Sequence, residues 1–141
     1  MKVQGALFCE FVRALPDGKC DIFGVFDSLS PPQVPFLMQL FFIYWNVLLD
    51  PSEELSTDPY RVTMVVIPPS KKDFVRSTME AVVTQNWPGE SIPMLPLAVP
   101  IAGVTFREYG IYTSQVTING HTLDGPKLLV RKPLGEKNAQ P

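Results

Sequence analysis

VQGALFCEFVR at residues 3–13 and DIFGVFD at residues 21–27 are two apolar segments joined by Leu15-Pro16-Asp17-Gly18-Lys19. Proline presets φ for the first central position of a turn, aspartate suits the second, and glycine accepts the left-handed position that follows. This order is typical of a three-residue hairpin loop closed by a glycine bulge. The stretch therefore predicts a β-hairpin that begins an all-β domain.

The turn also sets the register of this hairpin. With Leu15 facing Lys19, Phe8 meets Phe26 and Val12 meets Ile22. Side chains alternate between the two faces of a strand, so one face gathers the apolar residues and is assigned to the core. That face comprises Ala6, Phe8, Val12, Cys20, Ile22 and Phe26. The other face mixes charged groups with large apolar ones, and we expect a strand, a loop or a second subunit to cover part of it.

A second hairpin is predicted near the other end of the chain. Residues 109–118 form a strand pattern, and Asn119-Gly120 is the strongest short-range hairpin signal. In this hairpin Ile118 faces His121 and Val116 faces Leu123. Asp124-Gly125-Pro126 predicts a bulge or kink in the returning strand.

Extended segments also fill the chain between the hairpins. Residues 36–49, FLMQLFFIYWNVLL, are too few for the roughly 20 that a membrane helix needs, and their strand formers predict a long central strand, apolar on both faces. Residues 60–67 alternate as a strand does, and residues 74–84 are predicted as a strand, with a helix over 72–83 as the alternative. Residues 91–105 contain three prolines and predict an irregular edge segment. Residues 50–59 and 86–90 are predicted as a surface loop and a turn.

Composition places the chain among folded domains. Of the 141 residues 45% are apolar and 18% are charged, and the net charge is −2. We predict one domain over residues 1–132 and a flexible tail over residues 133–141. Turns about every ten residues indicate an antiparallel β-sandwich of immunoglobulin-like or jelly-roll type, with about seven or eight strands. The small negative charge predicts no binding to nucleic acid or to a membrane surface.

The two cysteines are predicted to be reduced thiols. In the register above Cys9 and Cys20 lie on opposite faces of the hairpin, so a disulfide between them would need different pairing. The short apolar run after Lys2 is interrupted by Glu10 and does not form an export signal. Together these features predict a cytoplasmic protein.

No pattern of residues that carries chemistry is evident, so we predict no catalytic residue, no cofactor and no metal. The one histidine, His121, lies beside a turn, and one histidine with two cysteines cannot build a usual zinc site. Glu10 lies opposite Gly24 in an apolar surrounding. We expect it to be buried in a salt bridge with Arg107 or Arg131 rather than to act as an acid catalyst.

Aromatic residues are the remaining candidates for a functional surface. Those singled out as interface or ligand contacts are Phe11, Phe23, Trp45, Trp87 and Tyr112. Exposed apolar patches mark interfaces, and sheets also associate through their edges. The sequence therefore predicts a non-enzymatic binding or assembly domain that acts through protein contacts and self-associates. The alternative is a small-ligand or carbohydrate-binding module that stacks its ligand on Trp45, Trp87 or Tyr112.

The chain also resembles a known group of proteins. The pattern GALFCE at residues 5–10, DGK at 17–19, IFGVFD at 22–27 and Pro35 before a long apolar strand is similar to small bacterial proteins classed only as a domain of unknown function. The late GIY at residues 110–112 and LLV at 128–130 resemble their ends, and also the last hairpin of many immunoglobulin-like domains. The resemblance implies a bacterial sandwich protein. Its motifs are structural, so it implies no catalytic residue.

Overall fold

The computed structural model describes residues 1–16, 19–49, 60–72, 75–81 and 94–134, and in these ranges every regular element is a β-strand. The strands are β1 (Lys2–Ala14), β2 (Cys20–Phe26), β3 (Ser28–Leu29), β4 (Phe36–Leu48), β5 (Tyr60–Ile67), β6 (Val75–Ala81), β7 (Met94–Phe106), β8 (Gly110–Ile118), β9 (His121–Asp124) and β10 (Leu128–Val130). The all-β prediction is confirmed. Ten strands replace the expected seven or eight, because β3 and β10 are short and β9 is separate from β10.

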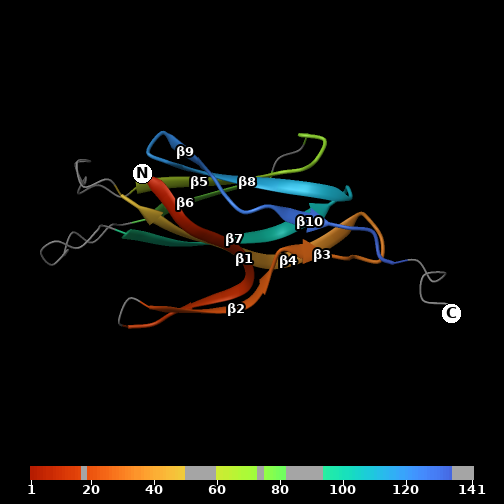
Figure 1. Ribbon diagram of the computed structural model, residues 1–141, viewed down its shortest axis with the longest axis horizontal. Helices are drawn as coiled ribbons and strands as arrows, with labels where there is room; N and C mark the ends of the chain where they lie inside the picture. The colour runs from red at the N-terminus through yellow and green to blue at the C-terminus, as the bar shows by residue number, and fades with distance from the viewer. Residues whose placement is uncertain (17–18, 50–59, 73–74, 82–93, 135–141) are drawn as a thin grey trace, which may run out of the picture.

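Two sheets pack face to face as a sandwich (Figure 1). Sheet A has four strands in the order β2-β1-β4-β7, and sheet B has six, in the order β3-β10-β8-β5-β6 with β9 also paired to β8. Neighbouring strands are antiparallel except β3 and β10, which are parallel. The predicted antiparallel sandwich is therefore correct as an architecture.

Strand β4 is the centre of sheet A, as its apolar sequence predicts. It pairs with β1 on one side and with β7 on the other. Its alternate residues Phe41, Ile43, Trp45 and Val47 are fully buried between the sheets, and the residues between them are half-buried on the outer face. From sheet B, β5 and β8 complete the core. Sheet B covers the inner face of β4, and part of its outer face packs against the first hairpin, where Phe42 meets the ring of Phe11.

The first hairpin has the predicted register, with Phe8 opposite Phe26 and Val12 opposite Ile22. The backbone NH of Leu15 donates to the carbonyl of Lys19 at 2.9 Å, as expected for that turn. Beyond this register the core assignment is only half right. Phe8 belongs to the core cluster and Ala6 and Phe26 pack against it, whereas Val12, Cys20 and Ile22 are half-buried outside it.

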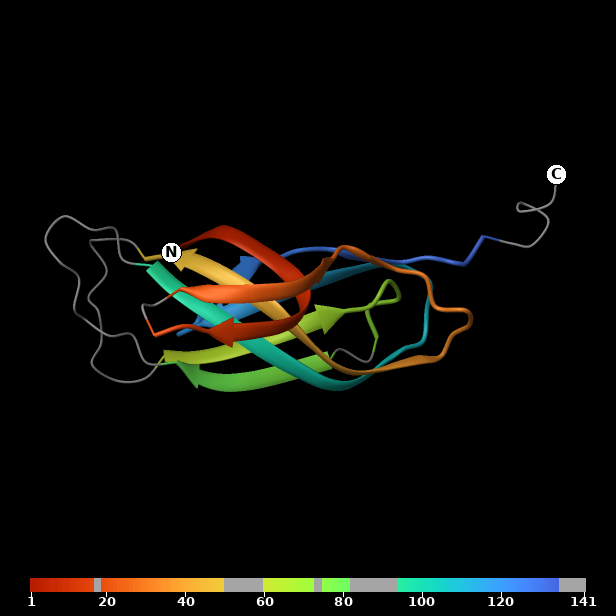
Figure 2. The same cartoon turned by 90° about the horizontal axis from the view of Figure 1, so that it is seen from below.

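A bend in β1 explains this correction. β1 pairs with β4 only as far as Cys9, whereas its pairing with β2 continues to Ala14. Beyond Cys9 the hairpin therefore leaves the plane of sheet A and lies on its side away from sheet B (Figures 1 and 2). Near this point Gly24 has a φ of +64°, a conformation that glycine adopts without steric cost.

The proline-containing segment is more regular than predicted. β7 is a continuous strand that pairs with β4 along its length, from Met94 opposite Leu48 to Phe106 opposite Phe36. It is an edge strand of sheet A, as the prolines required, and Pro96 and Pro100 are exposed. Proline has no backbone NH to donate. On an edge strand the position of that NH can face solvent, so no hydrogen bond to the neighbouring strand is lost.

The remaining predictions concern β6 and the second hairpin. β6 is a strand paired with β5, so the helix alternative over 72–83 is excluded for the described residues 75–81. Ile118 lies opposite His121 and Val116 opposite Leu123, as predicted. After Asp124 the pairing with β8 shifts by one residue, which is the predicted irregularity at Gly125. The loop predicted over 50–59 and the turn over 86–90 lie outside the described residues.

Candidate functional site

Large apolar side chains are exposed on the hairpin of β1 and β2 and on the adjoining part of β4. Phe11 is 48% exposed, Phe23 45% and Val25 60%, and Leu40 of β4 is 48% exposed. The ring of Phe11 contacts that of Phe23 at a centroid distance of 6.3 Å, and it meets Phe42 edge to face at 5.6 Å. We call Phe11, Phe23, Val25, Leu40 and Phe42 the hairpin patch.

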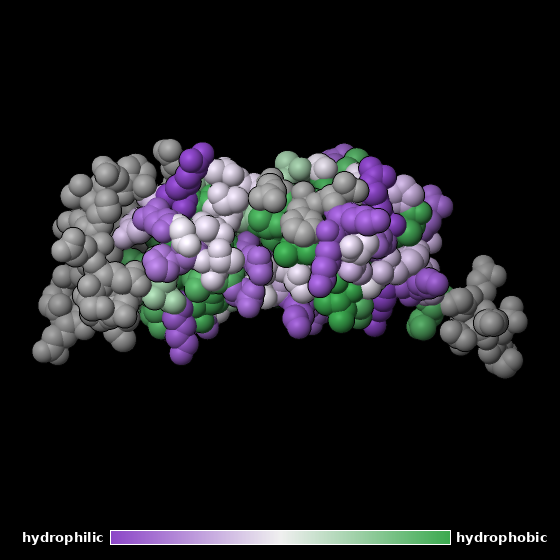
Figure 3. Space-filling model, turned by 90° about the horizontal axis from the view of Figure 1, so that it is seen from above, coloured by the Kyte–Doolittle hydropathy of each residue, from purple (hydrophilic) through white to green (hydrophobic). Residues whose placement is uncertain are grey.

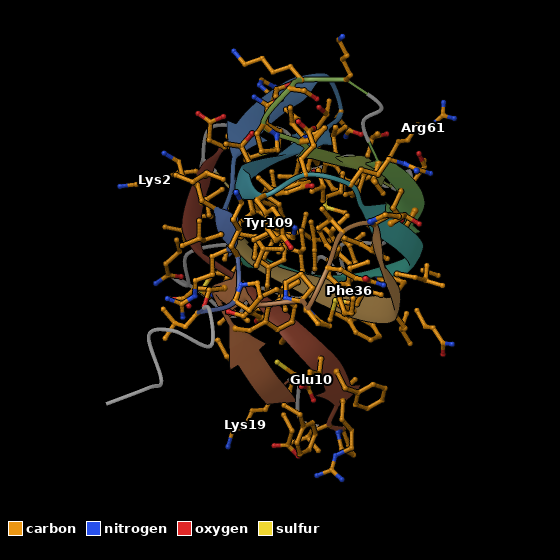
Figure 4. All side chains as sticks on the ribbon, turned by 90° about the vertical axis from the view of Figure 1, so that its right-hand side faces the viewer. Lys2, Glu10, Lys19, Phe36, Arg61 and Tyr109 are labelled. Atoms are coloured by element: carbon orange, nitrogen blue, oxygen red, sulfur yellow. The ribbon has the colours of Figure 1, made fainter. Side chains whose placement is uncertain are left out.

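The alternation of side chains between the two faces of β4 places this patch on the outside of the sandwich. Leu40 and Phe42 alternate with Phe41 and Ile43, which point into the core, so they lie on the outer face of sheet A. The hairpin projects from that face away from the body of the protein (Figure 4). On the opposite side of the molecule, hydrophilic and neutral residues cover much of the surface over sheet B, with apolar residues in smaller areas between them (Figure 3).

The hairpin patch lies beside an open sheet edge. β2 is the last strand of sheet A and is paired only with β1 among the described residues. Its far end carries an ion pair between the guanidinium of Arg13 and the carboxylate of Asp21. The same guanidinium lies 5.5 Å from the centre of the Phe23 ring, so a cation flanks the exposed aromatic surface.

Two thiols of the hairpin and a phenol of β4 lie close enough to influence one another. Burial, and secondarily the nearby Cys20 thiol, raise the pKa of Cys9. Burial is also the main cause that raises the pKa of Tyr44, and a hydrogen bond between its hydroxyl and the Cys20 thiol adds to it. Both cysteines are free, with Cys9 buried and Cys20 half-buried. A thiol that is buried like that of Cys9 remains protonated and is a poor nucleophile.

Two of the other predicted contact residues, Trp45 and Tyr112, are not on the surface. Trp45 is fully buried in the core, and Tyr112 is 4% exposed, so neither ring is a platform on which a surface ligand could stack. The hydroxyl of Tyr112 donates to the carbonyl of Glu108 at 2.9 Å and accepts from its NH at 3.2 Å. This is the arrangement of a tyrosine corner, which fixes a connection between two sheets. Trp87 lies outside the described residues.

Glu10 differs from its prediction. It is exposed on the hairpin (Figure 4) rather than buried, and no ion pair joins it to Arg107 or Arg131 in the described part of the chain. Its side chain lies against Gly24, where an added Cβ would come within 2.5 Å of its carboxyl carbon. His121 is exposed at the second hairpin, and the described residues contain no cluster of three or more side chains able to hold a metal ion.

Sequence reasoning identified Phe11 and Phe23 but missed Leu40 and Phe42. The alternation of residues 36–49 placed Leu40 and Phe42 on the face opposite Phe41. This face and the odd face of the hairpin could have been recognised as one continuous apolar surface. Within the described ranges there is no helix of the length and apolarity needed to cross a membrane.

Fold and surface together define a two-sheet β-sandwich protein with an exposed apolar hairpin. The chain belongs to a family of unknown function, DUF6941, which matches residues 4–131. The match includes all ten strands except the first residues of β1. No curated protein matches the chain.

Proposed function

We propose that this protein is a non-enzymatic assembly domain that binds a second copy of itself through the hairpin patch. The observation that carries the proposal is the position of Phe11, Phe23 and Val25 beside the open edge of β2. An edge strand presents unpaired NH and carbonyl groups, and exposed apolar side chains beside it add a surface that loses contact with water on association.

A dimer with a two-fold axis beside β2 would cover both the open strand edge and the exposed apolar side chains. In such a dimer the same strand meets its own copy, so the two β2 strands pair antiparallel and sheet A continues from one subunit into the other. The two Phe23 rings then lie near the axis, and each subunit contributes both charges of the Arg13–Asp21 pair at the rim.

The exposed area sets the expected strength. With about 200 Å² per aromatic side chain, the exposed fractions of Phe11 and Phe23 leave roughly 200 Å² of ring surface on each copy. Burying that surface on two copies is worth about 10 kcal/mol at about 25 cal/mol per Å². Association itself costs about 4–15 kcal/mol. We therefore expect a weak, concentration-dependent dimer rather than a permanent one.

The experiment is sedimentation velocity of the purified chain from about 1 to about 200 µM, the range in which a weak dimer dissociates. We expect the sedimentation coefficient to rise with concentration. Phe23→Ser and Val25→Lys should each yield a monomer throughout, because one removes half of the ring surface and the other places like charges beside the axis. Ile111→Ser is the matched control, since Ile111 is 55% exposed on β8 of the other sheet. A monomer at every concentration, or equal loss of dimer in the Ile111 variant, would refute the proposal.

We also propose a location, a strand connectivity and an origin for the protein. A cytoplasmic location is supported by two free cysteines in the described residues. An immunoglobulin-like connectivity is supported by the tyrosine corner at Tyr112, and a bacterial origin rests on the resemblance alone.

A further inference from the structure

A cavity of about 230 Å³ opens at one end of the sandwich, separate from the hairpin patch. It lies where the segment after β5, residues 68–72, approaches the end of β7 and the connection from β7 to β8. Its lining residues come from β5, β6, β7, β8 and these two connections. They are Val66, Pro68, Ser70, Lys72, Val75, Val104, Thr105, Phe106, Arg107, Glu108 and Tyr112.

The floor of the cavity is apolar and belongs to the core. Val66, Val104, Phe106 and Tyr112 are all buried. The rings of Phe106 and Tyr112 meet edge to face at 5.2 Å, which gives the floor a defined shape. The phenol of Tyr112 is engaged with the backbone of Glu108, so the cavity meets the ring rather than a free hydroxyl.

Hydrogen bonds hold the two connections at the mouth together. The hydroxyl of Ser70 donates to a carboxylate oxygen of Glu108 at 2.5 Å, and the backbone NH of Ser70 approaches the same oxygen at 3.4 Å. Tyr112 anchors the backbone of Glu108 from below. The mouth is therefore formed before any ligand binds, which lowers the entropic cost of binding.

The charges at the mouth are unequal. Lys72 and Arg107 both line the cavity, and neither makes an ion pair within the described residues. The one carboxylate of the lining, Glu108, already accepts hydrogen bonds from Ser70. Two cations and one carboxylate thus stand above an apolar floor, and the excess positive charge suits an anionic head on an apolar body.

We propose that this cavity binds a small carboxylate with an apolar body. A volume of about 30 Å³ for each water-sized group makes the 230 Å³ cavity large enough for about eight non-hydrogen atoms. The apolar body lies against Phe106 and Tyr112, and the carboxylate accepts hydrogen bonds from Arg107 and Lys72. This site is independent of the self-association proposed above.

The test is a titration of the ¹⁵N-labelled chain with hexanoate, which has about eight non-hydrogen atoms, followed by two-dimensional NMR. Hexan-1-ol and hexylamine are the uncharged and cationic probes. We expect hexanoate to bind about tenfold more tightly than hexan-1-ol, because hydrogen bonds to a charged group are worth at least that factor. The shifted amides should belong to residues 66–72 and 104–112.

Variants of the chain measure the contribution of the positive charge to affinity separately from that of the apolar floor. Arg107→Gln should weaken hexanoate about tenfold and leave hexan-1-ol unchanged. Arg61→Gln makes the same change in net charge at the other end of β5 and should alter neither affinity. Phe23→Ser, which disrupts the proposed dimer, should bind hexanoate as the original chain does. Equal affinity for hexanoate and hexan-1-ol, an equal effect of the two arginine variants, or shifts confined to the hairpin would each overturn the proposal.

Discussion

Gly125 is the position where a single methyl group should be most costly. It follows β9 and lies directly over the buried ring of Trp45. An added Cβ would overlap Cη2 of Trp45 and would lie 2.5 Å from its Cζ3 and 2.7 Å from Oγ of Ser114. Trp45 is fully buried, so the ring cannot turn away toward solvent.

The magnitude follows from these contacts. Overpacking a dense core costs about 1–3 kcal/mol. Displacement of Ser114 would also strain the hydrogen bond that its hydroxyl donates to the carbonyl of Pro126 at 2.6 Å, worth about 1 kcal/mol. We therefore expect Gly125→Ala to lower the free energy of unfolding by about 3 kcal/mol. In a domain of this size that lowers the melting temperature by about 10 °C.

The assay is urea unfolding monitored by tryptophan fluorescence and circular dichroism, with the melting temperature measured separately. Gly5→Ala is the matched control, because an added Cβ at Gly5 has no atom within 4 Å and Gly5 has no positive φ. It should change stability by less than about 0.5 kcal/mol. In a Trp45→Phe background the cost of Gly125→Ala should fall by about 1 kcal/mol or more, because the overlapping ring edge is gone.

Two results would refute this reasoning. One is equal stability of the two alanine variants, which would mean that the backbone at Gly125 moves at no cost. The other is an unchanged cost of Gly125→Ala when Trp45 is phenylalanine, which would place the clash elsewhere.

Further predictions concern the buried titratable groups and the surface ion pair. The pKa values of Cys9, Tyr44 and Tyr112 are all raised, chiefly by burial. Their contribution to stability is thus present below the unfolded-state pKa values and is lost as the pH rises through the folded-state ones, because the unfolded chain releases its protons first. Urea midpoints should therefore fall above about pH 9; a flat profile to about pH 11 would contradict this. Tyr112→Phe should cost about 1–2 kcal/mol in urea unfolding by leaving the Glu108 backbone groups without their partner, and a change below about 0.5 kcal/mol would argue against the tyrosine corner. Arg13→Gln should change the free energy of unfolding by less than about 1 kcal/mol, since its ion pair is exposed; a larger loss would show that the pair is screened from water.

The sequence alone predicted most of the strands and both hairpin registers, because the information for them is local, but it predicted an irregular segment where β7 is a continuous strand. A turn such as Asn119-Gly120 limits the pairing of the residues on either side, and alternation then decides which side chains share a face. The long apolar run at residues 36–49 likewise predicted a central strand, since its strand-forming residues are apolar on both faces and such a strand needs cover on both sides. In the same way, exposure of Phe11 and Phe23 followed from the mixed odd face of the first hairpin.

Tertiary structure decided the features that depend on residues far apart in the chain. The bend of β1 after Cys9 removed Val12 and Ile22 from the core, although their alternation with polar residues is the same as that of Phe8. Burial of Trp45 beneath Gly125 could not be foreseen, because the contact joins positions about eighty residues apart across the two sheets. The cavity at Arg107 exists only because two connections meet at one end of the sandwich. Local pattern specifies which backbone is extended, whereas the packing of one sheet on the other determines which side chains remain on the surface.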